Sequence, residues 1–412
     1  MCARDMDDDT PLHAAVPGLH RALRKGDMAT LGPTTRALTA IEGIDRETMV
    51  DVVREFALRV YDVRPAARAL AVQGIEALTL RGTDPSVLLA SVDALADALL
   101  DEAAVVRFSA ANAVSSLCVA TDGAEELDIL VTPLMAGLQD YDAGVRWASA
   151  RAAGRLGRTI TDEAALGEMV SELGLTLTDA FPAVRWSGAS ALATMAQRDL
   201  RPGEWGDVLP DVTAALEDEH PRVRRSAASV LTRLGSPDAV SAVADPVALA
   251  RSTFDTDAEG WSCLGDAFGF RHRDGHIRAY DLSFGTTMGW RPPSEFMGDI
   301  SRAYGGTLDF ELRQGIFGSE TYDDDDITLV GGGTKLVYDA PYSPGVDWTP
   351  YSVQFHESGG WRRGTTDGPL ATRDELLAVL SDVQHLRIRS EFTHYFDACA
   401  IDNVVLRAGP VQ

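Results

Sequence analysis

A 39-residue repeat constrains the fold more than any other feature of this 412-residue sequence. An Asp recurs every 39 residues, and an Arg follows each Asp six residues later. A fixed period of this length is typical of stacked repeats, in which each unit buries its apolar side against its neighbour. The five pairs are Asp62 and Arg68, Asp101 and Arg107, Asp140 and Arg146, Asp179 and Arg185, and Asp218 and Arg224.

Each repeat has the pattern of two helices joined by a short turn. Apolar residues upstream of the Asp follow i, i+3, i+7 spacing, as in Val92, Leu95 and Leu99, and mark a buried helix stripe. The Asp can accept backbone N–H groups in the turn, while the Arg can reach it or the next repeat. Because these pairs recur in every unit, we predict a structural ladder. Prolines that favour the start of the second helix follow three of the Asp residues: Pro65, Pro182 and Pro221.

The segments LLDEAAVVRFSAANAV and LEDEHPRVRRSAASVL resemble the HEAT repeat family, and a closely related armadillo-like variant is the alternative. The resemblance implies a helical solenoid that binds peptides or folded partners on the surface lined by its second helices. We assign residues 1–10 to an acidic tail and 11–45 to a divergent helical cap. Residues 46–236 form five repeats, and 237–251 form a capping helix and linker.

From about residue 252 the pattern changes to short alternating runs separated by Gly, Pro and Asp, which is typical of antiparallel strands. Thr372 and Glu375 form a capping box that predicts a helix over 373–382. The stretches FDTDAEGW, PPSEFMGDISRAYGGTLDFELRQ and WTPYSVQFHES resemble the laminin IV type A (laminin B) domain, over residues 252–408. That resemblance implies a jelly-roll-like β-sandwich without established catalytic residues. The predicted fold is therefore an all-α solenoid followed by an all-β sandwich.

The charge of the chain argues against nucleic acid and anionic lipid as partners. It carries 62 acidic and 37 basic residues, for a formal net charge of -25, which repels polyanions. Only Lys25 and Lys335 are lysines. We interpret the acidic, Arg-rich composition as halophilic adaptation, and a GC-rich genome is an alternative cause of the Arg bias. In such a chain, acidic pairs say little about catalysis.

The sequence predicts neither a secretory signal nor a membrane span, because it has no basic segment followed by an apolar one and no long apolar run. We therefore expect a cytoplasmic protein. The four cysteines have no zinc-ligand spacing. Cys263 and Cys399 either pair or remain thiols, and a reducing cytoplasm favours thiols.

One stripe of side chains on the second helices is a candidate partner-binding groove. Phe108, Trp147 and Trp186 follow the ladder Arg in three successive repeats, and aromatic anchors are typical hot spots. Arg151 and its equivalents Asn112 and Ser190 would supply the polar part of the groove. The alternative is that the rings fill gaps between repeats and the polar residues form an ordinary solvated face.

Two site hypotheses concern the sandwich, and each has a plainer alternative. Trp348, Tyr351 and Trp361 could stack on sugar rings, or they could complete the core. A structural calcium ion could join the first and last strands through Asp255 or Asp257 and Asp402, although solvated carboxylates are the default in so acidic a chain.

No catalytic motif stands out in the sequence, so we do not expect an enzyme. GGGTK at 331–335 lacks the spacing of a phosphate loop, and His272 with His276 lacks a third metal ligand. The leading hypothesis is a non-catalytic adaptor that binds protein partners through the solenoid and a second partner through the sandwich. The alternatives are a carbohydrate-binding protein and a HEAT-like, bilin-lyase-like enzyme, which only the repeat itself favours.

Overall fold

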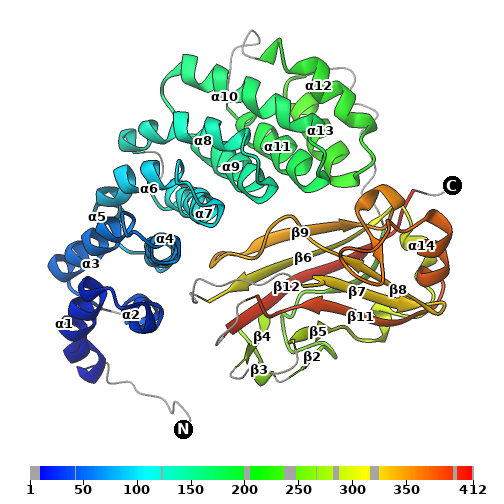
Figure 1. The fold of residues 1–412 in the computed structure, drawn as a ribbon. Coiled ribbons are helices and arrows are strands. Elements are labelled where there is room, and N and C mark those ends of the chain that lie inside the picture. The colour runs from blue at the N-terminus through cyan, green and yellow to red at the C-terminus, as the bar shows by residue number, and fades with distance from the viewer. Residues whose placement is uncertain are drawn as a thin grey trace. The chain divides into compact units, whose positions relative to one another are not determined.

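The computed structural model describes residues 10–41, 43–121, 124–198, 205–235, 247–265, 267–281, 287–315, 324–392 and 397–410. These residues form two compact units, one ending at Glu172 and the other beginning at Leu173. Helices make up the first unit and the start of the second, and antiparallel strands follow (Figure 1). The predicted fold class is therefore confirmed.

Five two-helix repeats follow a pair of N-terminal helices. Helices α1 (Thr10–Lys25) and α2 (Met28–Ala40) occupy the segment predicted as a cap. The first helical segments are α3 (Arg46–Arg59), α5 (Pro85–Leu88) with η1 (Leu89–Ser91) and α6 (Val92–Ala98), η2 (Glu125–Leu130) with α8 (Val131–Leu138), α10 (Glu163–Leu175) with η3 (Thr176–Thr178), and α12 (Leu209–Ala214) with η5 (Ala215–Glu217). The second helices are α4 (Pro65–Leu80), α7 (Ala104–Ala120), α9 (Ala143–Leu156), α11 (Pro182–Met195) and α13 (Pro221–Arg233).

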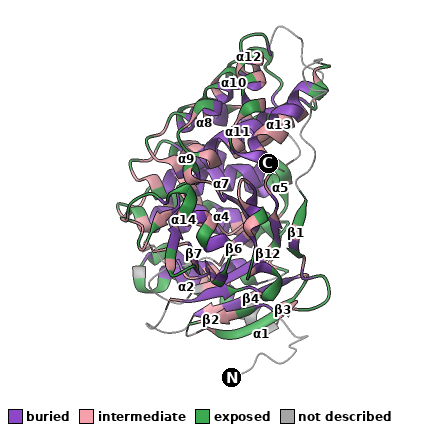
Figure 2. Ribbon diagram, turned by 90° about the vertical axis from the view of Figure 1, so that its right-hand side faces the viewer, coloured by how far each residue is buried: buried purple, intermediate pink, exposed green. Residues whose placement is uncertain are grey.

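Local sequence explains where the second helices begin and what the repeats bury. Pro65, Pro182 and Pro221 stand at the starts of α4, α11 and α13, as predicted, because a helix start needs no N–H from its first residue. The apolar stripe of the first helices is buried, as Val53 and Phe56 illustrate. Helix α4 packs against α7 and α7 against α9, while α11 packs against α13 in the second unit. Figure 2 shows much of α7 buried, although Val105 and Val119 near its two ends are exposed.

The described residues of the C-terminal domain form two six-stranded antiparallel sheets. Sheet A has the order β3-β4-β12-β6-β9, with β1 also paired to β12, and sheet B has the order β10-β8-β7-β11-β5-β2. The strands of sheet A are β1 (Ala248–Ser252), β3 (Phe268–Arg273), β4 (His276–Asp281), β6 (Thr307–Gln314), β9 (Thr349–Gln354) and β12 (Asp397–Arg407). Those of sheet B are β2 (Ser262–Leu264), β5 (Gly289–Arg291), β7 (Ile327–Gly331), β8 (Thr334–Tyr338), β10 (Arg362–Arg363) and β11 (Val383–Arg389).

Aromatic side chains fill the sandwich core. Phe270 of β3 and Trp290 of β5 have ring centroids 6.4 Å apart, which brings the two sheets into contact. Trp261 packs edge-on against Phe254 and Phe296. Helix α14 (Arg373–Leu380) begins with the predicted capping box, in which Thr372 and Glu375 bind each other's backbone N–H groups. It ends two residues earlier than predicted.

The predicted capping helix is wrong at its C-terminal end. Residues 236–246 lie outside the described part of the chain, but Ala248–Ser252 form the strand β1. This strand pairs with β12, with Arg251 opposite Val405 and Ser252 opposite Val404. Strand pairing gives backbone N–H and C=O groups hydrogen-bond partners, which the end residues of a short helix lack. The strand domain therefore starts before residue 252.

Within the second unit, the turn that begins α13 is docked on sheet A, and we call this contact the joint. Arg222 Nε lies 3.3 Å from Asp309 Oδ1 on β6. The Gln354 amide on β9 donates to the Glu219 carbonyl at 2.7 Å. The His220 ring lies 3.3 Å from the carbonyl oxygen of Ser352, which can only accept, so Nε2 carries the proton. The last repeat and the sandwich thus share buried polar contacts.

Candidate partner-binding surfaces

Three of the ladder arginines, Arg68, Arg107 and Arg185, each bind the carboxylate of the following repeat. Arg107 Nε and Nη2 bind the Asp140 carboxylate at 2.5 and 2.8 Å, and Nη1 donates to the Asp101 carbonyl at 2.7 Å. Asp140 also accepts the N–H of Asp142 at 2.9 Å, which holds the turn. Arg68 binds Asp101 in the same way. In the second unit Arg185 makes the same pair with Asp218.

The two ends of the ladder differ from its middle. Asp62, in the first repeat, is bound by Arg64 and Arg59 of its own repeat, and the hydrogen bond from Arg64 leads the causes that hold its pKa well below the usual range. Arg224, in the last repeat, donates to the carbonyls of Asp218 and Glu219, and burial lowers its pKa. Arg146 donates to the Asp140 carbonyl at 2.9 Å, and Asp179 accepts the N–H of Phe181. These contacts are those of a structural ladder.

The structure contradicts the predicted aromatic groove at its centre. Trp147 is only 1% exposed, and its ring stacks on Phe108 with centroids 6.3 Å apart. Asn112 is also buried, and Arg151 lies 5.9 Å above the Trp147 ring. These rings pack between neighbouring repeats, which was the alternative interpretation.

The other two members of the predicted groove lie in the second unit. Trp186 is half-buried, and the Arg222 guanidinium lies 4.6 Å above its ring. Arg222 is itself bound to Asp309 at the joint. Ser190 is also half-buried. Trp186 therefore helps to hold a structural arginine.

Exposed apolar side chains gather at the turns beside the ladder in the first three repeats. Val63 and Tyr141, each one residue after a ladder Asp, are 89% and 79% exposed. Tyr61 and Leu100, each one residue before a ladder Asp, are also exposed. Equivalent positions of stacked repeats lie on the same edge of a solenoid. We call Tyr61, Val63, Leu100 and Tyr141 the turn-edge patch.

Two members of the turn-edge patch are held in place by polar neighbours. The Tyr61 hydroxyl donates to Asp97 at 2.7 Å, and this bond is the main cause that raises the tyrosine pKa to about 12. The Arg107 guanidinium lies 4.9 Å above the Tyr141 ring. The sequence carried a signal for this patch, because its residues are apolar at turn positions where solvated side chains are expected. The groove predicted on the second helices did not include these residues.

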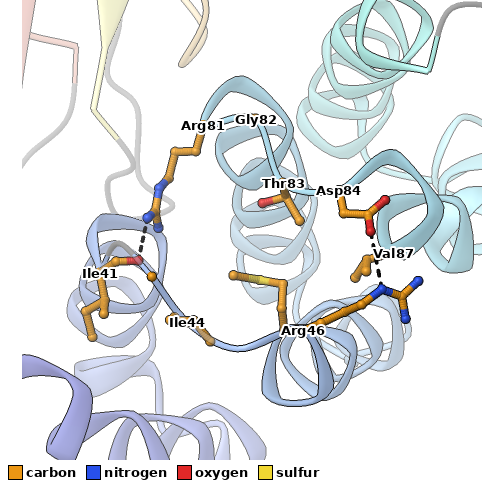
Figure 3. A pocket seen from close by; sticks show the side chains of 10 residues that line it. Ile41, Ile44, Arg46, Arg81, Gly82, Thr83, Asp84 and Val87 are labelled. Atoms are coloured by element: carbon orange, nitrogen blue, oxygen red, sulfur yellow. Dashed lines mark hydrogen bonds and ion pairs between the residues drawn. The ribbon is translucent and has the colours of Figure 1, made fainter.

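A cavity of about 290 Å³ lies between the loop that precedes α3 and the turn that precedes α5 (Figure 3). Its apolar wall includes Ile41, Ile44 and Val87. The Arg81 guanidinium donates to the Ile41 carbonyl, and Arg46 pairs with Asp84 at 3.2 Å. Both arginines that line the cavity therefore already have partners within the protein.

Two of the three aromatic residues predicted to bind sugar lie in the sandwich core, which contradicts that hypothesis. Trp361 is fully buried, and its indole N–H donates to the Gln354 carbonyl at 2.8 Å. Tyr351 is buried between Phe310 and Tyr342, whose ring centroids are each 5.0 Å away. Trp348 is half-buried, and Arg313 lies 4.7 Å above its ring. Here too the alternative interpretation, core packing, fits two of the three rings.

The acidic residues predicted to hold calcium make local hydrogen bonds. Asp255 accepts the Thr253 hydroxyl, Asp257 accepts the Glu259 N–H, and Asp402 accepts the Asn403 N–H. Burial, with the charges of Glu311 and Asp255 as further causes, raises the pKa of Asp402 to about 6. Among the described residues, no three His, Cys, Asp or Glu side chains are grouped as metal ligands.

The two histidines considered as metal ligands each contact a backbone carbonyl, and the cysteines of the described residues are free thiols. His272 Nε2 lies 2.6 Å from the Phe254 carbonyl, and His276 Nδ1 lies 3.2 Å from that of Asp274. Cys263 on β2 and Cys399 on β12 are free thiols, so the pairing alternative is wrong, and the thiol of Cys118 is free as well. Cys2 lies outside the described residues. Across the described part of the chain, no helix has the length and apolar character that a membrane crossing requires.

The fold and these surfaces define a two-part protein, a helical-repeat solenoid followed by an antiparallel β-sandwich. Family models match both parts: residues 170–255 match HEAT repeats, and residues 289–410 match Laminin B (Domain IV). The two parts of the chain are thus similar to the HEAT repeats and to the laminin B domain, as the two resemblances indicated. Neither is a catalytic family.

Two curated relatives each match about a third of the chain. The mouse (Mus musculus) basement membrane-specific heparan sulfate proteoglycan core protein is 36% identical over 119 residues, which is 28% of this chain and 3% of that protein. The basement membrane proteoglycan of Caenorhabditis elegans is 31% identical over 135 residues, or 32% of this chain and 4% of that protein. The chain thus spans only a small part of these relatives.

Solved structures are similar to each part. The L4b domain of human laminin alpha-2 matches 40% of this chain and 100% of its own length, with 16% identity and a TM-score of 0.32. A designed armadillo repeat protein matches 53% of this chain and 99% of its own length, with 18% identity and a TM-score of 0.42.

Proposed function

We propose that this protein is a non-catalytic adaptor that binds a partner protein along the turn-edge patch, with the sandwich as a second recognition module. The single observation that carries the proposal is the exposure of Val63 and Tyr141 at equivalent turn positions. Exposed apolar side chains that recur along one edge are typical of a protein-binding surface. Tyrosine is also enriched among the residues that dominate binding energy.

The ladder supports the same proposal. Arg68 and Arg107 tie successive repeats together through buried carboxylates. This arrangement keeps the turns at a regular spacing, so that a partner meets a preformed surface and loses less entropy on binding. Asp97 accepts the Tyr61 hydroxyl and Arg107 lies above the Tyr141 ring, so these two rings are also held in place before binding.

Affinity capture with the full chain, followed by purification of the captured protein, tests the proposal. We expect the double variant Tyr61→Ser and Tyr141→Ser to bind that protein at least about tenfold more weakly by calorimetry, since two anchor rings are removed. Val119→Ser is the matched control, because Val119 is 62% exposed at the end of α7 and lies outside the turn-edge patch. Equal affinities of the double variant and the control would contradict the proposal.

A further inference from the structure

A row of polar side chains crosses the outer face of sheet B, the face turned away from the core, where β11 lies between β5 and β7 (Figure 1). On β11, Leu386 and Ile388 are buried, so Arg387 between them points to the outer face. Paired positions on neighbouring strands share that face. The row has one member on each of β2, β5, β11 and β7: Ser262, Arg291, Arg387 and Thr328. We call it the outer row.

The two arginines of the outer row are neighbours across the strands. Ile388 pairs with Trp290, so the next position along these antiparallel strands sets Arg387 opposite Arg291. Side chains directly opposite each other have Cβ atoms about 5 Å apart, and like charges there destabilise a sheet. His385, two residues before Arg387, lies on the same face of β11. The sheet thus gathers positive charge at one place, in a chain whose net charge is -25.

The positive groups of this face have few partners within the protein. The side chains of Arg291 and His385 make no hydrogen bond or ion pair with any described residue. Asp324 Oδ2 lies 3.9 Å from Arg387 Nη2, which is too far for a hydrogen bond. Burial, followed by the charges of Arg291 and Arg387, lowers the pKa of His385. The carboxylates of the chain therefore leave the charge around His385 positive.

Both guanidinium groups of the outer row can be reached from solvent, and that of Arg387 is held in place. Arg291 is exposed. The Arg387 side chain lies over Gly289 of β5, where a Cβ would come 2.5 Å from its Nε. Its Nε and Nη2 are covered by neighbouring atoms. The side chain is nevertheless 20% exposed, which leaves Nη1 as the nitrogen that faces solvent. A ligand on this face therefore meets Nη1 of Arg387 and the guanidinium of Arg291.

We propose that the outer row binds one oxyanion group, a carboxylate, sulfate or phosphate. Arg291 and Nη1 of Arg387 donate charge-assisted hydrogen bonds to its oxygens, and the exposed hydroxyl of Ser262 donates from β2. The planar fork of arginine matches oxyanions in particular. Thr328 is buried and forms the floor of the site rather than a donor. The net charge of -25 opposes a polyanion, so the ligand is a single anionic group.

Nuclear magnetic resonance of the full chain tests the proposal, with the ring protons of His385 as the reporter. The variant His385→Gln identifies their signals by their loss. The probes are phosphate, sulfate and acetate, each titrated at constant ionic strength against sodium chloride, so that a response means preference for an oxyanion over a spherical ion. We expect saturable shifts with at least one probe. The probe that binds most tightly identifies the natural group as a phosphate, a sulfate or a carboxylate.

A matched pair of variants separates the outer row from ordinary surface charge. Arg291→Gln should weaken the binding at least about fivefold, because one charged donor is lost. Arg251→Gln should leave it unchanged, since Arg251 is also exposed and its side chain has no polar partner among the described residues, but it lies on β1 of sheet A. The melting temperature of Arg291→Gln should not fall, because the substitution removes a like-charge contact.

Three outcomes would overturn the proposal. One is the absence of saturable shifts with all three anions up to about 50 mM, a concentration that detects even weak binding. Another is equal weakening by Arg251→Gln. The third is a lower melting temperature of Arg291→Gln with unchanged anion binding, which would give Arg291 a structural role alone. The variants of the turn-edge patch should bind the anion like the wild type, so failure of either proposal is distinguishable from failure of the other.

Discussion

Arg68, Arg107 and Arg185 each bind the turn of their own repeat and the carboxylate of the next repeat. Arg107 binds two backbone carbonyls of its own turn and both oxygens of Asp140 in the next repeat. Only a guanidinium offers enough donors in a planar fork for these four contacts, and a lysine would leave acceptors unpaired. The chain has only two lysines, and at the ladder positions its preference for arginine thus has a structural reason.

We expect Arg107→Ala to destabilise the protein by about 3–5 kcal/mol, because it leaves the carboxylate of Asp140 buried without its partner. Arg46→Ala is the control, since the Arg46 and Asp84 side chains are 64% and 50% exposed and such pairs contribute less than about 1 kcal/mol. Thermal unfolding followed by far-ultraviolet circular dichroism compares the two variants. A similar loss of stability in both variants would show that the ladder ion pair contributes no more to stability than an exposed surface pair.

Asp402 predicts a pH dependence of stability. Its pKa is raised from 3.8 to about 6, so the folded state favours the protonated acid. The stability linked to this proton is fully present below pH 3.8 and is lost as the pH rises through about 6. We therefore expect Asp402→Asn to raise the melting temperature at pH 8 and to have little effect near pH 4, approximate test values either side of this window.

Calcium provides the second arm of the Asp402 experiment. We propose that, if Asp402 and Asp255 share a cation, calcium raises the melting temperature of the wild type at neutral pH and has no effect on Asp402→Asn. Equal effects of calcium on both proteins would remove these residues as ligands. A wild type without the pH dependence would contradict the raised pKa itself.

Close contact between helices depends on glycine at particular repeat positions. A Cβ on Gly188 of α11 would lie 1.7 Å from Thr176 Oγ1, and one on Gly137 of α8 would lie 2.3 Å from Ser149 Oγ. Both contacts are shorter than atoms allow, so the two helical segments of a repeat approach closely only because these side chains are absent. Small residues in the second helices serve the same packing, as the buried Ala111 and Ala150 illustrate.

Two glycines in helix interiors should respond in opposite ways to the same substitution. We expect Gly188→Ala to destabilise by about 1–3 kcal/mol, because the new methyl group meets buried Thr176. Gly167→Ala in α10 should stabilise by up to about 1 kcal/mol, because nothing lies within 4 Å of its Cβ and alanine is the better helix former. Melting temperatures of the two variants test the argument. A stabilising Gly188→Ala would contradict close packing at that position.

The last repeat and the sandwich share a buried ion-pair network. Asp309 binds Arg222 on one side and Arg407 of β12 on the other, and it accepts the Ser352 hydroxyl at 2.6 Å. Burial by itself would raise the pKa of Asp309, but the charge of Arg222 and these bonds outweigh it and lower the pKa. Burial lowers the pKa of His220 to about 4, so this ring is neutral in the joint near neutral pH.

We expect Arg222→Ala to loosen the joint without unfolding the sandwich, because Asp309 keeps its bond from Arg407. Hydrogen exchange measured by mass spectrometry should increase in the turn 218–222 and in β9. These two segments are joined by the contacts of Glu219 with Gln354 and of His220 with Ser352, which a looser joint weakens. Arg233→Ala, at the exposed end of α13, is the control and should leave exchange unchanged. Unchanged protection in both variants would show that the joint does not depend on this ion pair.

The sequence predicted the repeated features of the chain well. It predicted less well the role of side chains whose function depends on whether they are buried. The spacing of Asp101 and Arg107 predicted the repeat and its ladder, because every copy obeys the same local rule. For Trp147 and Trp361 the sequence offered core packing beside a binding role, because a large aromatic side chain suits both a core and a binding surface, and the structure shows both residues buried. The turn-edge patch was not predicted, because exposed apolar residues are common on protein surfaces.

The amino-acid sequence by itself determined the helical repeats, the starts of helices at Pro65, Pro182 and Pro221, the capping box at Thr372 and the change to strands in the second half. These features depend on residues close together in the chain, whose spacing is readable directly. Only the tertiary structure decided that Ala248–Ser252 forms a strand, that Trp147 is buried and that Arg222 meets Asp309. Each of these depends on contacts between distant segments, and such contacts exist only once the chain has folded.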